Sequence, residues 1–175
     1  MNMVLLLLLS TGAQAATINV TGDTTGSPTW GRPGSGTPPT SGSTSSPFNS
    51  YSFTVDVSGA YDVEIVTQTF DSYLHLFENS FNPLTPFANI IEGDDDDGLA
   101  CGLCAGIYGA SMTAGTTYFA IISGFGGASG SYDMQLSGAG NITPATASAV
   151  PVPAAVWLMG SAILGLLGAG RRKTA

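Results

Sequence analysis

Apolar and polar side chains alternate with a period of two residues along most of the middle of this chain. In residues 51–57, Tyr, Phe and Val alternate with Ser, Thr and Asp, and residues 61–66 repeat the pattern. Successive side chains of a strand point to opposite faces of a sheet, so this pattern predicts two strands, each with one buried face. The intervening Ser58-Gly59-Ala60 is short, which predicts that the two strands form a hairpin.

Further short strands follow, and turn-forming residues separate them. We expect these strands at residues 73–77, 87–91, 106–112, 117–122 and 131–136. The run at 117–122 is almost continuously apolar, which indicates a central strand. No stretch of residues 48–138 has helical periodicity, and about 90 residues suffice for one core. The predicted fold class is therefore all-β, a single antiparallel β-sandwich of jelly-roll or Greek-key type.

The segments on either side of this domain have a different composition. Residues 17–20 alternate and predict a first strand, but residues 21–47 are dominated by Gly, Ser, Thr and Pro, with little besides Trp30 to bury. Such a segment gains too little from burial to offset the entropy of ordering. We therefore expect 16–47 to hold a possible first strand and a long surface loop, and 139–149 to be a linker.

The N-terminal residues 1–15 are predicted to be a signal peptide. An apolar run is followed by Ala13-Gln14-Ala15, the small-residue pattern that signal peptidase cuts, so Ala16 becomes the new N-terminus. No Lys or Arg precedes the run, and we expect translation to start upstream of Met1.

The other end of the chain has the pattern of a membrane anchor. Residues 154–170 carry no charge and are followed by Arg171, Arg172 and Lys173. A helix of this length reaches about 25 Å, a thin but sufficient transmembrane span. Clustered cations stay on the cytoplasmic side, so the preceding chain is expected outside the cell. An ordinary single-pass anchor is one interpretation of this segment.

A resemblance favours a second interpretation. Val150, Pro151, Val152, Pro153 and Ala154, the Trp-containing apolar stretch and the basic stop resemble the PEP-CTERM sorting signal in its V-P-L-P-A subtype. Val152 stands where the commonest form of the signal has Glu. The resemblance covers residues 150–175 and implies recognition by exosortase, a membrane protease-transferase. It also implies a place at the surface, or in the extracellular matrix, of an exopolysaccharide-producing Gram-negative bacterium.

Charge limits the partners of the exported part. The chain has 12 acidic and 4 basic residues, and Arg32 is the only basic residue before the tail, which leaves a net charge of −11. Nucleic acid is excluded as a partner because phosphate contacts need a basic patch. Such acidity favours solubility or the binding of divalent cations.

A second resemblance concerns the domain itself. The segments that carry it, in order, are 70–77 (FDSYLHLF), 82–84 (NPL), 94–98 (DDDDG), 112–124 (MTAGTTYFAIISG) and 130–136 (GSYDMQL). They resemble the bacterial pre-peptidase C-terminal domain, which implies a jelly-roll-like sandwich attached to secreted or surface proteins. Some members bind calcium or help to hold polymeric substrates. Residues 98–106 are an insertion relative to that pattern.

Within this resemblance, the acidic loop is the candidate metal site. Asp96 and Asp97 match the family's D-D-G pair, and Asp71 matches the Asp that opens the strand expected at 73–77 and can face this loop. Closely spaced carboxylates suit Ca²⁺, which takes 6 to 8 oxygen ligands. We expect Asp71, Asp95 and Asp97 to help ligate calcium, with Asp96 as a further candidate; a solvated acidic turn is the alternative.

The two cysteines, Cys101 and Cys104, allow three readings. A zinc site lacks ligands other than His75, and an acidic, Gly-rich loop opposes the thiolate of a redox pair. We therefore predict a local disulfide formed in an oxidising exterior.

Enzymatic activity is not expected. His75, the sole histidine, lies in the middle of a predicted strand, where a structural role or a surface polar contact is usual. A carboxylate pair among Asp62, Glu64 and Glu78 stays open. Two functions remain: a structural component of the polysaccharide matrix, and a carbohydrate-binding module. The module requires exposed aromatic residues, for which the candidates are Tyr51, Tyr61, Tyr73, Tyr108, Tyr118 and Phe125.

Overall fold

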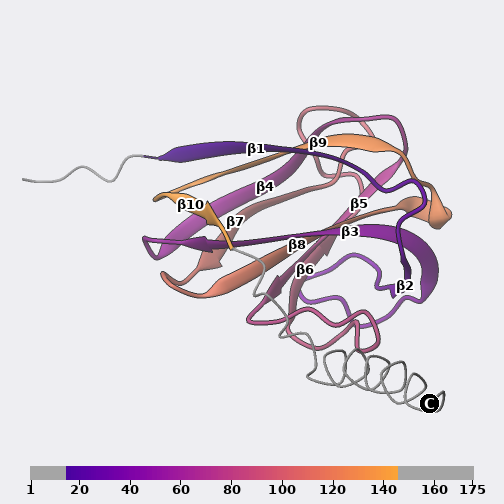
Figure 1. Ribbon diagram of the computed structural model, residues 1–175, viewed down its shortest axis with the longest axis horizontal. Helices are drawn as coiled ribbons and strands as arrows, with labels where there is room; N and C mark the ends of the chain where they lie inside the picture. Colours follow the sequence, from indigo (N-terminus) through magenta and orange to yellow (C-terminus); the bar gives the residue numbers. More distant parts are fainter. Residues whose placement is uncertain (1–14, 146–175) are drawn as a thin grey trace, which may run out of the picture. The chain divides into compact units, whose positions relative to one another are not determined.

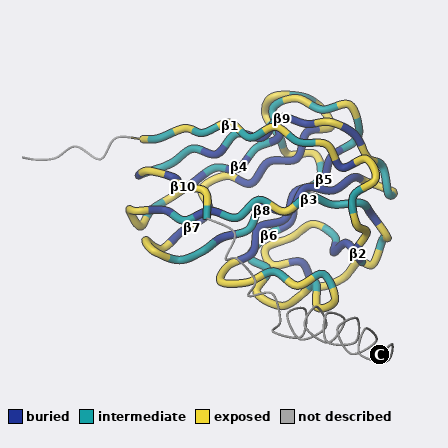
Figure 2. The backbone as a smooth tube through the Cα atoms, in the orientation of Figure 1, coloured by how far each residue is buried: buried dark blue, intermediate teal, exposed yellow. Residues whose placement is uncertain are grey.

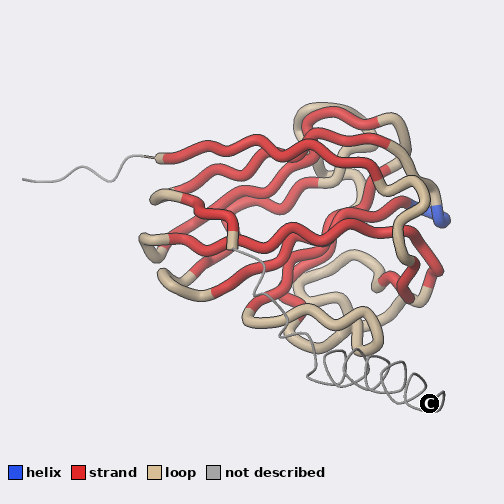
Figure 3. The backbone as a smooth tube through the Cα atoms, viewed as in Figure 1, coloured by secondary structure: helices blue, strands red, loops and turns tan. Residues whose placement is uncertain are grey.

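Two antiparallel sheets face each other in the computed structural model, which describes residues 15–145 (Figure 1). The first sheet has the order β1 (Ala16–Asp23), β9 (Ser131–Gly138), β4 (Gly59–Gln68), β7 (Gly106–Met112). The second has the order β10 (Ile142–Pro144), β3 (Thr44–Val55), β8 (Thr117–Gly124), β5 (Ser72–Glu78), β6 (Ile90–Asp94), and β2 (Thr29–Arg32) also pairs with β3. Figure 3 shows that strands make up most of the described chain, in which the only helical element is the 3-10 turn Phe125–Gly127. The all-β prediction is confirmed.

The main core lies between the two sheets. Val63 and Ile65 of β4 and Met134 of β9 pack there with Leu74 of β5 and Ile122 of β8. Val63, Ile65 and Met134 are apolar positions of the period-two pattern, so alternation in the sequence identified the inward faces of β4 and β9 correctly. Burial of these side chains removes apolar surface from water, the main favourable contribution to folding.

The predicted hairpin between residues 51–57 and 61–66 is wrong. β3 pairs with β8, β10 and β2 in the second sheet, whereas β4 pairs with β7 and β9 in the first. The turn at Ser58 therefore carries the chain from one sheet to the other. A cross-sheet connection and a hairpin give both strands the same alternation, so the pattern could not distinguish them.

The prediction that residues 21–47 form a surface loop is also wrong. β1 extends to Asp23, β2 pairs with the start of β3, and Trp30 and Arg32 are buried. The segment covers the outer face of the second sheet, where Trp30, Phe77 and Ile121 form a separate buried cluster with the half-buried Phe48 and Phe81. Contact with this sheet supplies the burial that the segment lacks by itself, which offsets the entropy of ordering it.

Strand β5 is consequently buried on both faces (Figure 2). Leu74 and Leu76 point into the main core, and Phe77 belongs to the outer cluster. Gly36 and Gly93 exchange two backbone hydrogen bonds of 2.8 and 2.9 Å, which attach the same N-terminal segment to β6.

The strands β6 and β10 differ from prediction for the same reason. The strand expected at 87–91 is displaced to Ile90–Asp94, so residues 92–94, which follow the expected strand, lie within β6. Within the predicted linker 139–149, Ile142–Pro144 form β10 against β3. Pairing across the sheet, rather than local composition, ordered both segments.

No helix within residues 15–145 combines the length and apolar character that a membrane span requires. The predicted signal peptide and the predicted C-terminal transmembrane helix lie outside the described residues, except for Ala15.

Candidate functional site

The acidic loop that follows β6 is held in place by its first member, Asp94. Asp94 is buried, and its Oδ2 accepts backbone hydrogen bonds from Asp97 at 3.1 Å and from Gly106 at 2.8 Å. Burial raises the pKa of Asp94, and the two backbone donors oppose this rise. The carboxylate thus joins the end of β6 to the start of β7, and the residues after it turn outward. Sequence analysis missed this role because the four consecutive aspartates look equivalent in the sequence.

Three of the four predicted metal ligands converge. Asp71 lies immediately before β5, Asp95 and Asp96 lie immediately after β6, and the two strands are antiparallel neighbours. One carboxylate oxygen from each of the three lies within 4.8 Å of the other two. Asp97 is not part of this group, so the expected set of Asp71, Asp95 and Asp97 is replaced by Asp71, Asp95 and Asp96.

The cluster concentrates negative charge in a partly desolvated place. Burial, followed by repulsion from Asp96 and Asp71, raises the pKa of Asp95 to about 6. Burial and then Asp96 also raise the pKa of Asp71. The Arg32 guanidinium opposes both shifts and does not cancel them. A bound cation would favour the ionised forms of these groups.

The donor set fits a hard divalent cation. Oδ1 of Asp71 and Oδ1 of Asp95 are buried atoms without a hydrogen-bond donor in the described structure. Buried acceptors are normally paired, and within residues 15–145 no donor pairs these two oxygens. Carboxylate oxygen is the ligand type that Ca²⁺ prefers. Asp71, Asp95 and Asp96 are therefore the residues that would hold such an ion.

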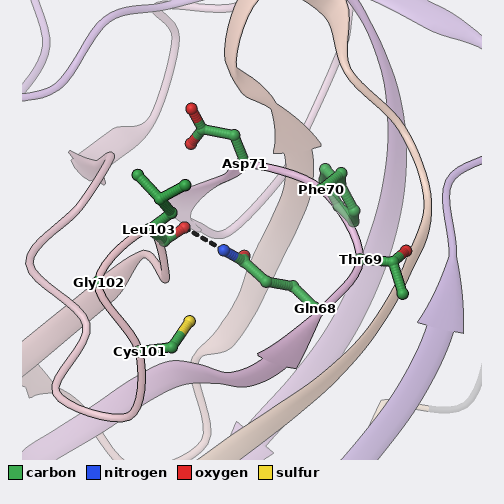
Figure 4. A pocket seen from close by; sticks show the side chains of 7 residues that line it. All are labelled: Gln68, Thr69, Phe70, Asp71, Cys101, Gly102 and Leu103. Atoms are coloured by element: carbon green, nitrogen blue, oxygen red, sulfur yellow. Dashed lines mark hydrogen bonds between the residues drawn. The ribbon is translucent and has the colours of Figure 1, made fainter.

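A hollow adjoins the cluster on the side of Asp71. It encloses about 450 Å³ and is lined by Gln68, Thr69, Phe70, Asp71, Cys101 and Leu103, together with Gly102 (Figure 4). Figure 4 shows the Gln68 amide directed at the Leu103 carbonyl, to which its Nε2 donates a hydrogen bond. Leu103 is half exposed, and Phe70 also packs against the main core. We name this space the Phe70 hollow. Of the residues that line it, sequence analysis had assigned a role only to Asp71 and Cys101.

The other side of the cluster is polar. A second hollow of about 370 Å³ lies between residues 35–37 and residues 92–97, which include Asp95 and Asp96. The three carboxylates thus lie between one largely apolar hollow and one acidic hollow.

The predicted disulfide is confirmed. Cys101 and Cys104 are bonded, with Cα atoms 5.2 Å apart. Cys104 is fully buried in the main core, and its backbone oxygen accepts a hydrogen bond of 2.7 Å from Gly98. The disulfide and this bond fix the inserted loop next to the acidic cluster.

His75 has a structural environment. It is fully buried, its ring stacks on Tyr73 with centroids 5.0 Å apart, and Trp30 meets it edge-on at 5.3 Å. Its Nε2 lies 3.1 Å from the Pro33 carbonyl and 3.2 Å from that of Gly34, so Nε2 carries the proton. Burial lowers the pKa of His75 to about 3. The ring therefore anchors the N-terminal segment as a neutral imidazole, in agreement with the predicted structural role.

Two of the three carboxylates left open for a catalytic pair have local partners. Asp62 Oδ1 accepts a hydrogen bond from the Gly109 backbone, and Glu64 Oε1 accepts one from Ala100. Neither belongs to the carboxylate cluster.

The aromatic residues proposed to bind sugar differ in their exposure. Tyr61, Tyr73 and Tyr118 are buried, Tyr51 is half-buried, and Tyr108 and Phe125 are exposed. The first three belong to the interior and offer no platform for a sugar ring.

The remaining predicted site residues lie outside the described part of the chain. They are the sorting motif Val150, Pro151, Val152, Pro153 and Ala154 and the basic stop Arg171, Arg172 and Lys173.

Comparisons with known proteins are sparse. No protein-family model matches the chain, and no curated protein sequence matches it. Among solved structures, the crystal structure of Aeromonas hydrophila PliG, a periplasmic lysozyme inhibitor of g-type lysozyme, is similar, with 12% sequence identity and a TM-score of 0.43. The alignment covers 75% of this chain and 91% of that chain. A likeness at this level carries no argument about the site.

Proposed function

We propose that this protein is an exported, non-enzymatic component of the bacterial surface or extracellular matrix that binds calcium through Asp71, Asp95 and Asp96. The observation that carries the proposal is the approach of three carboxylate oxygens to within 4.8 Å, two of them on side chains with a buried oxygen that lacks a donor. Calcium would neutralise their mutual repulsion. It would also link the residue before β5 to the loop after β6, which stabilises that end of the sandwich.

Export is supported by two independent features. The Cys101–Cys104 disulfide is typical of proteins that mature in an oxidising compartment. The sequence also carries the pattern of a signal peptide at residues 1–15 and a PEP-CTERM-like tail at 150–175. We therefore propose processing by signal peptidase, transient anchoring by the tail and sorting by exosortase.

The finer fold assignment belongs to the same proposal. From β6 to β10, each connection passes from one sheet to the other, as do those from β3 to β4 and from β4 to β5. Repeated crossing between two antiparallel sheets is typical of jelly rolls and supports the proposed likeness to the pre-peptidase C-terminal domain.

Calcium binding is tested by calorimetric titration and thermal melting of the exported domain after treatment with a chelator. We expect saturable binding and a melting temperature that rises with calcium, because a ligand that binds only the folded state stabilises it. Asp71→Asn and Asp96→Asn should each abolish most of the shift, whereas Asp62→Asn, which removes a carboxylate outside the cluster, should retain it. Absence of a shift at millimolar calcium would refute the cation site.

Sorting is tested in a host that encodes an exosortase. Replacement of Pro151 and Pro153 by Ala should leave the protein in the membrane with its tail intact, and neutralisation of Arg171, Arg172 and Lys173 should disturb retention. Release of an unchanged, correctly processed product from both variants would contradict the sorting proposal.

The carbohydrate-binding alternative has less support because half of its six candidate aromatic residues are buried. Exopolysaccharide remains a proposed partner through calcium bridging between acidic surfaces. A pull-down with polysaccharide, with and without calcium, distinguishes bridging from saturable binding of one glycan.

A further inference from the structure

The surface of residues 15–145 has no exposed cationic side chain. Arg32 is the only Lys or Arg in this range, and it is 5% exposed, with its guanidinium carbon 3.5 Å from the centre of the Tyr73 ring. His75, the only histidine, is fully buried. The side-chain charges that the described domain presents to a partner are therefore all negative at neutral pH. A field of one sign attracts ligands of the opposite charge and repels a second copy of the same domain.

The Phe70 hollow combines this charge with an apolar wall. Phe70, Leu103 and the disulfide at Cys101 supply apolar surface, and Asp71 supplies a carboxylate that continues into the cluster with Asp95 and Asp96. An occupant that fits has an apolar or flat body and a positively charged head.

The polar side chains of the hollow do not by themselves select an occupant. The Gln68 Nε2 donates to the Leu103 carbonyl, which orients the amide and leaves its buried Oε1 without a donor. Asp71 Oδ1 also lacks a donor, and the Thr69 hydroxyl already accepts a hydrogen bond from the Ser131 backbone at 3.0 Å. Both oxygens are acceptors, but both are buried, so an occupant of the hollow does not reach them without a change of side-chain conformation. The negative charge of Asp71 and the apolar wall, rather than these two oxygens, therefore define the occupant.

A guanidinium group meets all of these requirements. It has five N–H donors and no acceptor, carries its charge at any physiological pH, and stacks on aromatic rings. Its aliphatic stem can lie along apolar surface such as Leu103. We propose that the Phe70 hollow receives an arginine side chain of a basic protein partner, with Asp71 as its counter-ion. This interaction surface is separate from the proposed calcium function except for Asp71, which belongs to both.

Because Asp71 belongs to both proposed sites, calcium and arginine would affect each other's binding. Calcium held by Asp71, Asp95 and Asp96 would withdraw the counter-ion from the hollow and bring a second positive charge close to the guanidinium. Calcium therefore weakens arginine binding, and the partner binds best to the calcium-free protein.

The test uses calorimetry on the exported domain in a chelator at low and at physiological salt, with acetyl-triarginine amide as the probe. Acetyl-tricitrulline amide, which has the same shape without the charge, is its control. We expect saturable binding of the arginine peptide, no measurable binding of the citrulline peptide, and affinity that falls with added salt. Asp71→Asn should weaken binding roughly tenfold, and Phe70→Ala roughly threefold.

Two further comparisons decide the outcome. Asp62→Asn removes the same charge outside the hollow, so an equal loss in Asp62→Asn and Asp71→Asn would overturn the proposal in favour of general attraction to an acidic protein. Unchanged affinity in Phe70→Ala and Leu103→Ser would also overturn it. These two variants leave all the carboxylates in place, so their calcium titration reports separately on the proposed calcium site. Calcium binding without peptide binding would refute the proposed arginine site and would leave the proposed calcium site standing.

Discussion

The guanidinium of Arg32 lies over the ring of Tyr73, 3.5 Å from its centre, and that ring stacks on His75. Arg32 belongs to β2 and Tyr73 to β5, so the stack joins the N-terminal segment to the outer face of the second sheet. The Arg32 NH1 also donates a hydrogen bond of 2.9 Å to the Pro33 carbonyl. A charged residue is thereby accommodated in an almost fully buried place.

Loss of this contact should loosen the N-terminal segment. Arg32→Ala is expected to lower the free energy of unfolding by about 1–3 kcal/mol, through lost cation–π attraction and lost packing of the side-chain stem. Chemical denaturation measures the change. Thr40→Ala, at an exposed position of the same segment, serves as the control and should stay within about 0.5 kcal/mol of the parent. Equal stability of the two variants would contradict a role for the stack.

Gly93 on β6 contacts the N-terminal segment and therefore also tests how that segment is attached to the second sheet. A Cβ at Gly93 would lie 2.7 Å from His75 Cδ2 and 2.8 Å from the Gly34 carbonyl oxygen. Gly93→Ala should therefore displace residues 34–39 and destabilise the protein by about 1–3 kcal/mol. Gly102→Ala, where nothing lies within 4 Å of the added atom, is the matched control. Faster hydrogen exchange confined to residues 30–40 in Gly93→Ala would support the mechanism.

The buried imidazole predicts a dependence of stability on acid. Because burial lowers the pKa of His75 to about 3 from 6.5, the unfolded chain binds a proton that the folded protein does not bind in this range. Stability that is present above pH 6.5 is lost as the pH falls toward 3. His75→Gln keeps a donor for the Pro33 and Gly34 carbonyls and cannot titrate. Its unfolding free energy should decrease less between pH 7 and pH 4, and a parallel decrease in both proteins would argue against this assignment.

The carboxylate cluster predicts a pH dependence of stability that is opposite to that of His75. In the calcium-free protein the pKa of Asp95 is raised to about 6, so the folded state holds its proton more tightly than the unfolded state does. The contribution of Asp95 to stability therefore falls as the pH rises from about 4 to 6. NMR titration of the Asp95 carboxyl carbon should give the raised pKa, and saturating calcium should lower it. An ordinary pKa that calcium leaves unchanged would count against the clustering of Asp71, Asp95 and Asp96.

The disulfide should stabilise the loop next to the carboxylate cluster. Closing a short loop contributes about 2 kcal/mol in the chain-entropy view. The double variant Cys101→Ala, Cys104→Ala should lose about this much stability and bind calcium more weakly, because Gly98 beside the acidic loop is hydrogen-bonded to Cys104. Mass spectrometry of the exported parent should show two hydrogens fewer than the dithiol. Calcium affinity that is identical in the double variant would show that the loop is positioned without the disulfide.

The sequence by itself determined most strands, and for 51–57, 61–66 and 131–136 it also determined the inward faces, because alternation directly reports which side chains share a face of a strand. It also determined the Cys101–Cys104 disulfide, because two cysteines separated by two residues meet through local geometry alone.

Only the tertiary structure decided which strands pair and what residues 21–47 do. The turn at Ser58 is compatible with a hairpin or with a crossing between sheets, and only competition among all possible partners selects the crossing. Trp30 and Arg32 are ordered by Tyr73, His75 and Phe77, which lie more than 40 positions later in the chain. In the same way, proximity across β5 and β6 selected Asp71, Asp95 and Asp96 and buried Asp94. Long-range contacts of this kind leave no periodic trace in the sequence, because each partner contributes a single side chain.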